Sequence, residues 1–436
     1  MSNALLNISD ITNEGLMVLE NEMVVADKIN REFDDRFGVD GAKIGYTLNL
    51  RKPARFTVSG GPNLQVQDFL ETSVPVTLTN QAHIDTQFIT SDLLLSMDMF
   101  NKRVLRPKIA ALANSVDATI ALFMKNNIAN IIGTPGTLPT TTAPFFTSGA
   151  ILDTESVPRD GDRHLVMDQF THASMVPSLQ GLYNPQNIIA EQYKKGLLAR
   201  DALGYQNYMD QNIASHTFAS WAGSPVYNNT VGTSSALLAT GWSDSGTFGL
   251  SGFTAATAVV NVGDTFTIAG VYMVNPQNRN ITRQLRTFVV RPPVGGLSNG
   301  TFSAVNDVFG NVVGGTYTSD GAGKLQLTVA VAIISGGQFQ NVNVAPANAA
   351  VIVPTGVNQT GPQNLAFHRD AFTLVSADLD LPGGVDMAAR ASHKDVGMSM
   401  RIVRQYTIGN DAKPCRIDIL YGIASMYREL GCRISG

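Results

Sequence analysis

The side chains that could support catalysis or bind a metal ion are scattered through this sequence. No two histidines have the spacing of a metal site, and neither Cys-x-x-Cys nor His-Glu-x-x-His occurs. No Gly-x-Ser-x-Gly elbow is present, and neither Cys415 nor Cys432 has a histidine nearby that would make it a nucleophile. We therefore expect no catalytic residue, no metal ion, no cofactor and no enzymatic activity. The histidines are His83, His164, His172, His216, His368 and His393.

Two local patterns resemble ligand sites but have simpler interpretations. The GAGK run at residues 321–324 looks like part of a phosphate-binding loop, but Leu325 stands where such a loop needs Ser or Thr. We expect a hairpin turn there. Two pairs of carboxylates beside turns could bind a cation, although such groups are usually only solvated: Asp160 with Asp162, and Asp378 with Asp380.

The composition indicates a protein that covers much of its surface with other protein. The chain has 436 residues, a formal net charge of -4 and charged side chains at 15% of positions, below the usual quarter or so. It lacks the basic excess that a nucleic-acid binder needs. Two cysteines are too few for a disulfide framework, so we expect a reducing compartment. No signal peptide is visible, and the most apolar run, residues 325–334, is too short to span a membrane.

Residues 107–132 predict the element around which the rest of the chain is arranged, a long α-helix. Pro107 fits the first helical turn, and Gly133 with Pro135 would stop the helix. The rod would be roughly 39 Å long. It is either the core helix of an ordinary globular domain or a spine along which a large, flat subunit is built. Its apolar residues recur at steps of three and four: Ile109, Leu112, Ala113, Val116, Ile120, Phe123, Met124, Ile128 and Ile131.

Residues 11–33 predict an amphipathic N-terminal helix, which would be marginal unless it docked on another element. One stripe is apolar and runs from Leu16 to Phe33, while acidic side chains occupy much of the remaining surface. We hypothesise that three of these carboxylates make the contacts of an N-terminal arm: Glu14, Glu20 and Glu22.

Residues 46–89 change to period two and predict two long strands joined near Gly60. Pro53 and Pro75 argue for an exposed ribbon or sheet edge rather than central strands. A two-stranded ribbon is barely stable alone, so it must pack on its own body or on another subunit. Three basic residues cluster midway along its first strand: Arg51, Lys52 and Arg55. They are either a solvated face or a contact with acidic groups of a neighbouring subunit, and the second is our hypothesis.

The remaining parent segments give weaker signals. A short helix is predicted before the spine at residues 91–105, a Thr/Pro/Gly loop at 133–146 and a strand at 163–168. Residues 184–209 carry a helical pattern, and residues 366–436 mix helical and strand patterns.

The sharpest change in composition comes after Trp221. From about residue 224 to 361 the chain is rich in Gly, Thr, Val and Asn, and contains no His, Cys or Glu. Turn signals separate the strand candidates. This pattern predicts an all-β insert that interrupts one parent domain. The candidates are residues 265–274, 284–291, 324–334 and 342–345.

Three stretches, together with the order of the parts, resemble the major capsid (coat) proteins of short-tailed bacteriophages. LGYQNYMDQNIASHTFASWAG at residues 203–223 is similar to the family segment that leads into the insert, and NLAFHRDAFTLVSADLDLPGG at residues 364–384 is similar to the exit. Residues 399–434 resemble the family's closing strands, with Arg416-Ile-Asp418 and Leu420-Tyr-Gly422 the most telling. The insert matches only in general character.

The resemblance implies an α+β fold of the tailed-phage type named after phage Hong Kong 97, with a long spine helix, an extended β-ribbon loop and an inserted β-barrel. It also implies a division of the chain into six parts. These are residues 1–44, the N-terminal arm; 45–90, the extended loop; 91–132, the spine helix and peripheral domain; 133–223, the first part of the axial domain; 224–361, the insert; and 362–436, the closing part of the axial and peripheral domains.

By the same resemblance, the function is structural. Copies would form hexamers and pentamers of an icosahedral shell, first around a scaffolding protein in the host bacterial cytoplasm, and the shell would expand as DNA is packaged through a portal protein. The shell would enclose double-stranded DNA without sequence-specific binding and without a membrane. Two alternatives remain: another virion protein, such as a fibre or decoration protein, which would not need the spine, and an enzyme with a β accessory domain, which lacks candidate residues.

Overall fold

The computed structural model describes residues 12, 15–19, 22–33, 47–89, 106–179, 201–232, 234–330, 332–393, 397–410 and 412–435. The chain divides into two compact units, and each is described by itself. The first consists of Met1–Leu50, Pro75–Ala121 and Phe372–Ala424, and the second of Arg51–Val74, Leu122–Ala371 and Ser425–Gly436.

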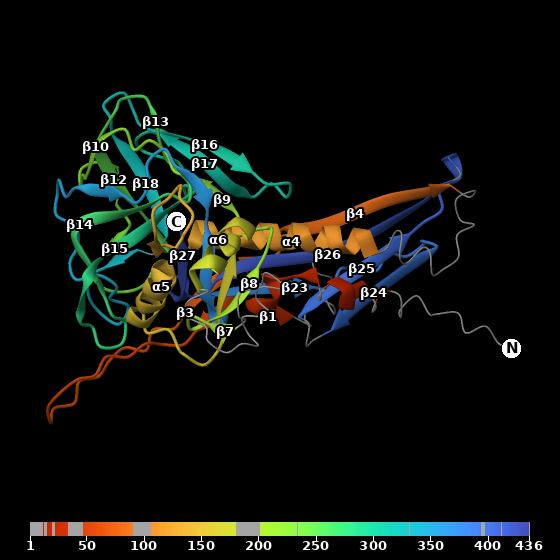
Figure 1. Cartoon of the computed structure of the whole chain (residues 1–436), viewed down its shortest axis with the longest axis horizontal. Helices are drawn as coiled ribbons and strands as arrows, with labels where there is room; N and C mark the ends of the chain where they lie inside the picture. Colours follow the sequence, from red (N-terminus) through yellow and green to blue (C-terminus); the bar gives the residue numbers. More distant parts are fainter. Residues whose placement is uncertain are drawn as a thin grey trace. The chain divides into compact units, whose positions relative to one another are not determined.

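The first unit is built on a six-stranded sheet and the long helix α4 (Arg106–Asn127), which begins in this unit (Figure 1). The stripe predicted from the sequence is the buried face of α4, since Ile109, Leu112, Val116 and Ile120 are almost fully inaccessible. The sheet has the order β1 (Asn30–Phe33), β23 (Phe372–Ala377), β26 (Ala412–Ser425), β25 (Met398–Arg404) and β24 (Met387–His393), with β4 (Asn80–Ile89) also paired to β26. Short 3-10 turns lie at η1 (Ala26–Lys28) and η5 (Ile408–Asn410).

The predicted N-terminal helix ends earlier than its apolar stripe suggests. Residues 15–19 are helical, but β1 has already begun at Asn30 and pairs in parallel with β23. The buried carboxylate of Asp117 on α4 accepts hydrogen bonds from the backbone N–H groups of Val24, Val25 and Ala26. These N–H groups bond a side chain instead of helical carbonyls, so tertiary contacts override the local helical pattern.

The helix α4 is also shorter than predicted, ending at Asn127 instead of residue 132. The Asn127 side-chain amide donates to the carbonyl of Phe123, and the chain then forms β5 (Ile131–Ile132), which pairs in parallel with β27 (Gly431–Ile434). Ile131 is buried as predicted, but in a strand.

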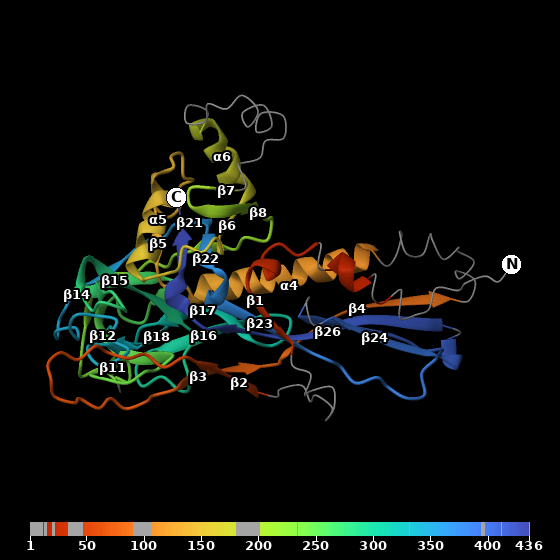
Figure 2. The same ribbon diagram turned by 90° about the horizontal axis from the view of Figure 1, so that it is seen from below.

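The second unit contains a six-stranded sheet that carries two helices, α5 (Ala143–Thr154) and α6 (Gln169–Leu179) (Figures 1 and 2). Phe145 and Leu152 of α5 and Met175 of α6 pack on the sheet residues Leu165 and Ile434. The strands run in the order β5, β27, β22 (Asn364–His368), β6 (Arg163–Met167), β8 (Tyr205–Met209) and β7 (Asp201–Ala202). The turns η4 (Arg369–Ala371) and η6 (Arg428–Leu430) follow β22 and β26 in the chain.

Several parent segments differ from their sequence patterns. Within the range predicted to be helical, residues 201–209 form the hairpin β7–β8, whose two-residue turn places Leu203 and Gly204 at positive φ. Two positive φ values match the right-handed twist of paired strands, so the turn fixes a hairpin. The predicted loop at residues 133–146 contains the start of α5, and α6 was not predicted. The predicted strand at 163–168 is β6. Residues 366–436 form strands and 3-10 turns within the described part. The predicted helices at residues 91–105 and 184–200 lie outside the described residues.

The insert is all-β and is built around a sheet that closes on itself. The edge strands β10 and β20 meet through a bridge between Val226 and Val351, and Tyr227 exchanges backbone hydrogen bonds with residues 349 and 350. The result is a small barrel. Its strands have the order β10 (Gly223–Tyr227), β12 (Ser245–Phe253), β18 (Leu325–Ala330), β15 (Ile281–Arg291), β14 (Thr265–Val274) and β20 (Ile352–Pro354).

Smaller strands complete the insert. A three-stranded sheet has the order β13 (Ala258–Asn261), β17 (Val312–Thr318) and β16 (Thr301–Asn306), and β11 (Leu237–Leu238) pairs with β19 (Ile333–Ile334). The predicted hairpin at residues 321–324 is a turn, but its flanking strands β17 and β18 belong to different sheets, so it is not a hairpin. Asp320 stabilises it by accepting the N–H groups of Ala322 and Lys324. Residues 342–345 form only an isolated bridge, from Val342 to Met273.

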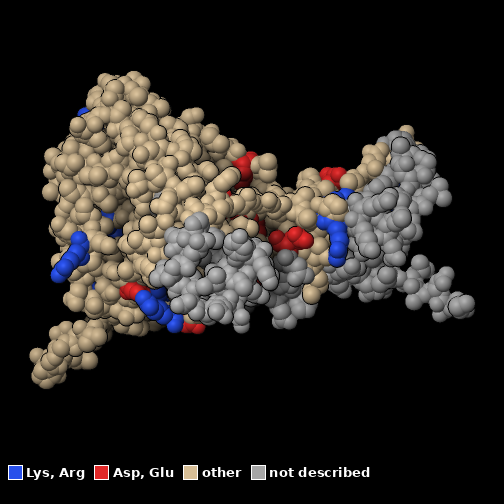
Figure 3. Space-filling model, in the orientation of Figure 1, with Lys and Arg blue, Asp and Glu red and all other residues tan. Residues whose placement is uncertain are grey.

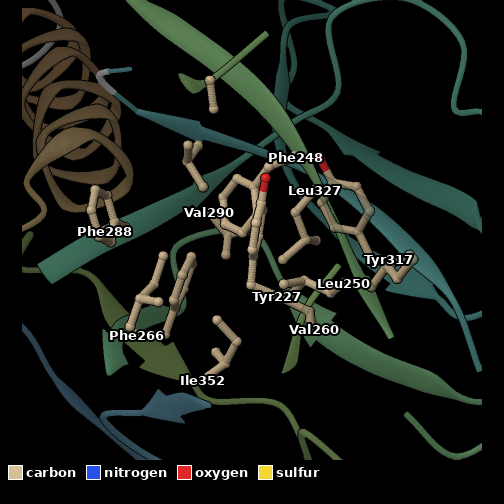
Figure 4. Close-up of a cluster of buried hydrophobic side chains, with 14 of the residues drawn as sticks. Tyr227, Phe248, Leu250, Val260, Phe266, Phe288, Val290, Tyr317, Leu327 and Ile352 are labelled. Carbon is tan, nitrogen blue, oxygen red and sulfur yellow. The ribbon is translucent and has the colours of Figure 1, made fainter. Parts of the chain in front are cut away.

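Aromatic side chains fill the interior of the barrel (Figure 4). Phe248 and Phe266 are fully buried with ring centroids 5.8 Å apart, and Tyr227 lies 6.1 Å from Phe248. Glycine is required on β12, because a Cβ at Gly249 would lie 2.0 Å from the carbonyl oxygen of Val231. The glycine content of this region therefore reflects close backbone packing.

The chain enters and leaves the insert through one pair of strands. The strand β9 (Ser215–Thr217) pairs antiparallel with β21 (Thr360–Pro362), placing His216 opposite Gly361. The two connections to the parent sheet therefore lie side by side, as domain insertion requires.

Candidate assembly interface

The extended loop, residues 53–71, leaves the second unit as a thin double trace between β2 (Thr47–Lys52) and β3 (Thr72–Thr77) (Figure 1). The prediction of two long strands joined near Gly60 is wrong in this part, because the first strand ends at Lys52 and residues 53–71 contain no strand. The two arms of the loop are nevertheless linked. The Thr57 N–H donates to Gln67 Oε1 at 2.9 Å, the Gln67 amide donates back to the Thr57 carbonyl, and the rings of Phe56 and Phe69 lie 6.1 Å apart. Pro53 follows directly after β2, where it ends the strand.

The loop exposes large apolar side chains to solvent. No charged residue occurs between Arg55 and Asp68, and the projecting part is uncharged in Figure 3. A contiguous exposed apolar surface on a soluble chain usually marks a site of protein association. The exposed apolar residues of the loop are Phe56, Val58, Leu64, Val66, Phe69 and Leu70.

The base of the loop is held by residues far away in the sequence. Lys52 is only 9% exposed, and its Nζ lies 4.7 Å from the ring centroid of Trp242 and 5.0 Å from that of Tyr427. A cation over two aromatic faces is stabilised by their quadrupoles. Burial lowers the pKa of Lys52 to about 8, although the carboxylates of Glu429 and Asp244 oppose the shift.

Arg55 makes the second contact at the base. Its Nη2 donates to Glu429 Oε1 at 2.9 Å, and its guanidinium lies 5.9 Å from the ring centroid of Phe339. Burial alone would raise the pKa of Glu429, but Arg55 and Lys52 outweigh burial and lower it. Lys52, Arg55 and Glu429 line a small cavity of about 50 Å³. Arg55 and Glu429 also line a larger, open pocket of about 450 Å³.

Of the three basic residues singled out in the sequence, the structure brings Lys52 and Arg55 together with partners of the same chain. Arg51 is different: its side chain is 79% exposed, with Glu71 3.8 Å away. The intersubunit role of all three stays a prediction. Sequence reasoning missed Trp242, Phe339, Tyr427 and Glu429. Arg55 and Glu429 are 374 positions apart, so no local pattern could pair them. One hint was visible in the sequence, which is that Glu429 is the first glutamate after Glu191.

The acidic residues assigned to the N-terminal arm are largely outside the described part. Glu14 and Glu20 lie outside it, whereas Glu22 is described and exposed. Their contact role stays a prediction.

Two of the carboxylates that could have bound a cation instead contact basic side chains of the same chain. Asp160 accepts a hydrogen bond from His368 at 3.2 Å, and Asp378 lies 3.3 Å from Arg390. Among the described residues, no group of His, Cys, Asp or Glu side chains could hold a metal ion. No helix in the same part of the chain is long and apolar enough to cross a membrane.

One buried polar network joins the last turn of α4 to the insert. His216 Nε2 donates to Asp264 at 2.9 Å, and Lys125 Nζ lies 3.3 Å from His216 Nδ1. Asp264 also accepts the indole N–H of Trp221, and the fully buried Arg433 donates to the carbonyl of Gly263. Burial, with Lys125 and Arg433 nearby, lowers the pKa of His216 to about 4, although Asp264 opposes the shift. Burial, with Arg433, lowers that of Lys125 to about 8.

The comparisons with known proteins identify the class of this molecule. Residues 62–436 match the family model described as P22 coat protein, gene protein 5. The match covers most of the chain, so this protein belongs to the P22 coat protein family. It is a bacteriophage major capsid protein, a structural component of the virion capsid that associates with copies of itself. A comparison with curated protein sequences finds no significant match.

Solved phage structures give more distant likenesses. Mycobacterium phage Che8 aligns with a TM-score of 0.45 and 11% identity over 94% of this chain and 90% of that chain. The capsid of cyanophage P-SCSP1u aligns at 0.42 and 8% over 95% and 88%, and the mature capsid of bacteriophage PhiM1 at 0.42 and 8% over 100% and 89%. These scores are low, so the assignment depends on the family match. With the long helix and the inserted barrel, that match confirms the predicted α+β capsid fold.

Proposed function

We propose that this chain forms an icosahedral shell in the host cytoplasm, first around a scaffolding protein. The shell then expands as double-stranded DNA enters through a portal protein. Membership of the coat protein family supports the shell, and the small net charge supports a container that does not grip its nucleic acid. The protein acts by packing, without catalysis. Its proposed domains are the six parts of the chain that the family resemblance implies.

The observation that carries this proposal is the exposed apolar loop. Six large apolar side chains stand in solvent on a segment with little structure of its own. Covering them on a neighbouring subunit would remove apolar surface from water at about 25 cal/mol per Å². The loop is therefore the proposed intersubunit element. Arg51, on the preceding strand β2, is the exposed cation beside it, and Glu22 is the described carboxylate of the arm.

Electron microscopy of the purified chain, alone and with its cognate scaffolding protein, tests the proposal. We expect closed shells of uniform size when the scaffolding protein is present. The same mixture with Leu64, Val66 and Phe69 all changed to Ser should contain folded subunits and few shells. Uniform shells from that triple variant would remove the loop from the intersubunit contact. Fibres or isolated subunits from the native chain with scaffolding protein would contradict shell formation itself.

A further inference from the structure

Contacts within the loop do not fix the direction in which it projects from the second unit. Residues 53–71 form no strand, and their side chains are mostly exposed, so few contacts within the loop oppose bending at its base. The loop nevertheless belongs to the same compact unit as the insert, while residues 47–50 and 75–89 on either side belong to the other unit.

One segment of the insert touches both arms of the loop. Phe339 lies under the Arg55 guanidinium on the outgoing arm, and the neighbouring Gln338 donates from Nε2 to the carbonyl of Asp68 on the returning arm at 2.8 Å. This segment is itself fixed, because Arg279 donates to the carbonyls of Gly337 and Gln338. Two arms held by adjacent residues cannot pivot independently.

The chain segment after β26 supplies further contacts to the base of the loop. Tyr427 lies against Lys52, and Glu429 pairs with Arg55. The neighbouring Arg428 is buried and donates to Asp244, two residues after Trp242. The insert and the closing segment therefore meet around the base of the loop.

We propose that the insert has a positioning function: with the closing segment, it clamps the base of the extended loop and fixes the loop's direction before subunits assemble. The loop clamp consists of Lys52, Arg55, Trp242, Gln338, Phe339, Tyr427 and Glu429. A loop that is already oriented loses less conformational entropy when it binds a neighbour, so the clamp favours assembly without contacting the neighbour. This function concerns the isolated subunit and holds whichever surface the loop later covers.

Distance measurement between two nitroxide labels on the unassembled full-length chain tests the clamp. One label is placed at the loop tip through Asn63→Cys and the other on an exposed turn of the insert through Ala255→Cys. The native Cys415 and Cys432 are buried, so labelling is selective. We expect one narrow distance distribution, which broadens when Lys52→Met and Glu429→Gln are introduced together.

Matched variants separate the clamp from a general loss of charge. Arg51→Met removes a cation one residue away but outside the clamp, and Lys52→Arg keeps the cation between the two rings; both should keep the narrow distribution. Lys52→Met alone carries the same test if the double variant does not fold. A broad distribution in the native chain, an unchanged distribution in the clamp variants, or equal broadening by Arg51→Met would overturn the proposal. A native chain that gives a narrow distribution but forms no shells with its scaffolding protein would contradict the proposed shell formation and not the clamp.

Discussion

The extended loop and the barrel of the insert place the same kinds of side chain in opposite settings. Phe248 in the barrel is fully buried among other aromatic rings, whereas Phe69 in the loop is 70% exposed. The barrel buries its interior aromatic side chains within one chain. The loop leaves its apolar surface uncovered within the chain, as expected of the intersubunit element that we propose.

The largest expected effect comes from the barrel. Phe248→Ala should lower the free energy of unfolding by about 3–5 kcal/mol, because it removes a ring from a closed, well-packed interior. Calorimetry of the full chain should show an earlier transition. The conservative change Phe248→Leu should lower the free energy of unfolding clearly less than Phe248→Ala does. Equal stability of Phe248→Ala and the native chain would mean that the barrel interior is loosely packed.

The buried network at the neck of the insert should make stability depend on pH. The folded pKa of His216 is about 4 against an ordinary 6.5. Between these values the unfolded chain therefore binds more protons, and stability falls as pH drops from 6.5 to 4. The loss should approach about 3 kcal/mol. Denaturation by urea across this range measures it.

His216→Gln is the control for that pH dependence. It removes the titrating group while leaving a side-chain amide that can donate to Asp264. The difference in slope between the native chain and this variant isolates the contribution of His216. Identical slopes would exclude His216 as the source.

Substitutions in the loop should affect assembly and leave stability nearly unchanged, in contrast to substitutions in the barrel. Phe69→Ala should change the free energy of unfolding by less than about 0.5 kcal/mol, while reducing the yield of shells in sedimentation. Phe170 on α6 is 71% exposed, so Phe170→Ala is a control of the same type and exposure. If both variants assemble equally well or equally poorly, the exposed apolar side chains of the loop are no more important for assembly than those elsewhere on the surface.

The smallest expected effect on stability is at Arg51. Arg51→Glu should change the free energy of unfolding by only tenths of a kcal/mol, since the side chain is exposed and Glu71 is 3.8 Å away. If Arg51 meets acidic groups of a neighbour, the same change should block or misdirect assembly. Arg55→Glu is less clean, because it also breaks the pair with Glu429. Normal shells from Arg51→Glu would place this residue in solvent.

The parts predictable from sequence were those encoded by local periodicity. The buried stripe of α4 follows from steps of three and four, and β14 matches its predicted range of residues 265–274. The misses arise where distant residues decide. The helical pattern before Asn30 gives way because Asp117 and β23 recruit that backbone, and the positive φ at Leu203 turns a helical pattern into a hairpin.

The candidate interface shows the same limit. The cluster of Arg51, Lys52 and Arg55 was visible in the sequence, but spacing alone could not separate the exposed member from the two with partners in the chain. That distinction depends on Trp242 and Glu429, which come beside the loop only through tertiary packing.

The pairing of β9 with β21 has a consequence for how such a molecule could change over evolutionary time. Because the strands that enter and leave the insert are neighbours, the barrel is connected to the parent sheet at one place, through two adjacent chain segments. A replacement domain would join the parent sheet through the same two adjacent ends. It would also need to supply the contacts that Trp242 makes with Lys52 and that Asp264 makes with His216. Exchange of the barrel between related phages, or its substitution by a foreign domain for display, is therefore easiest at this neck.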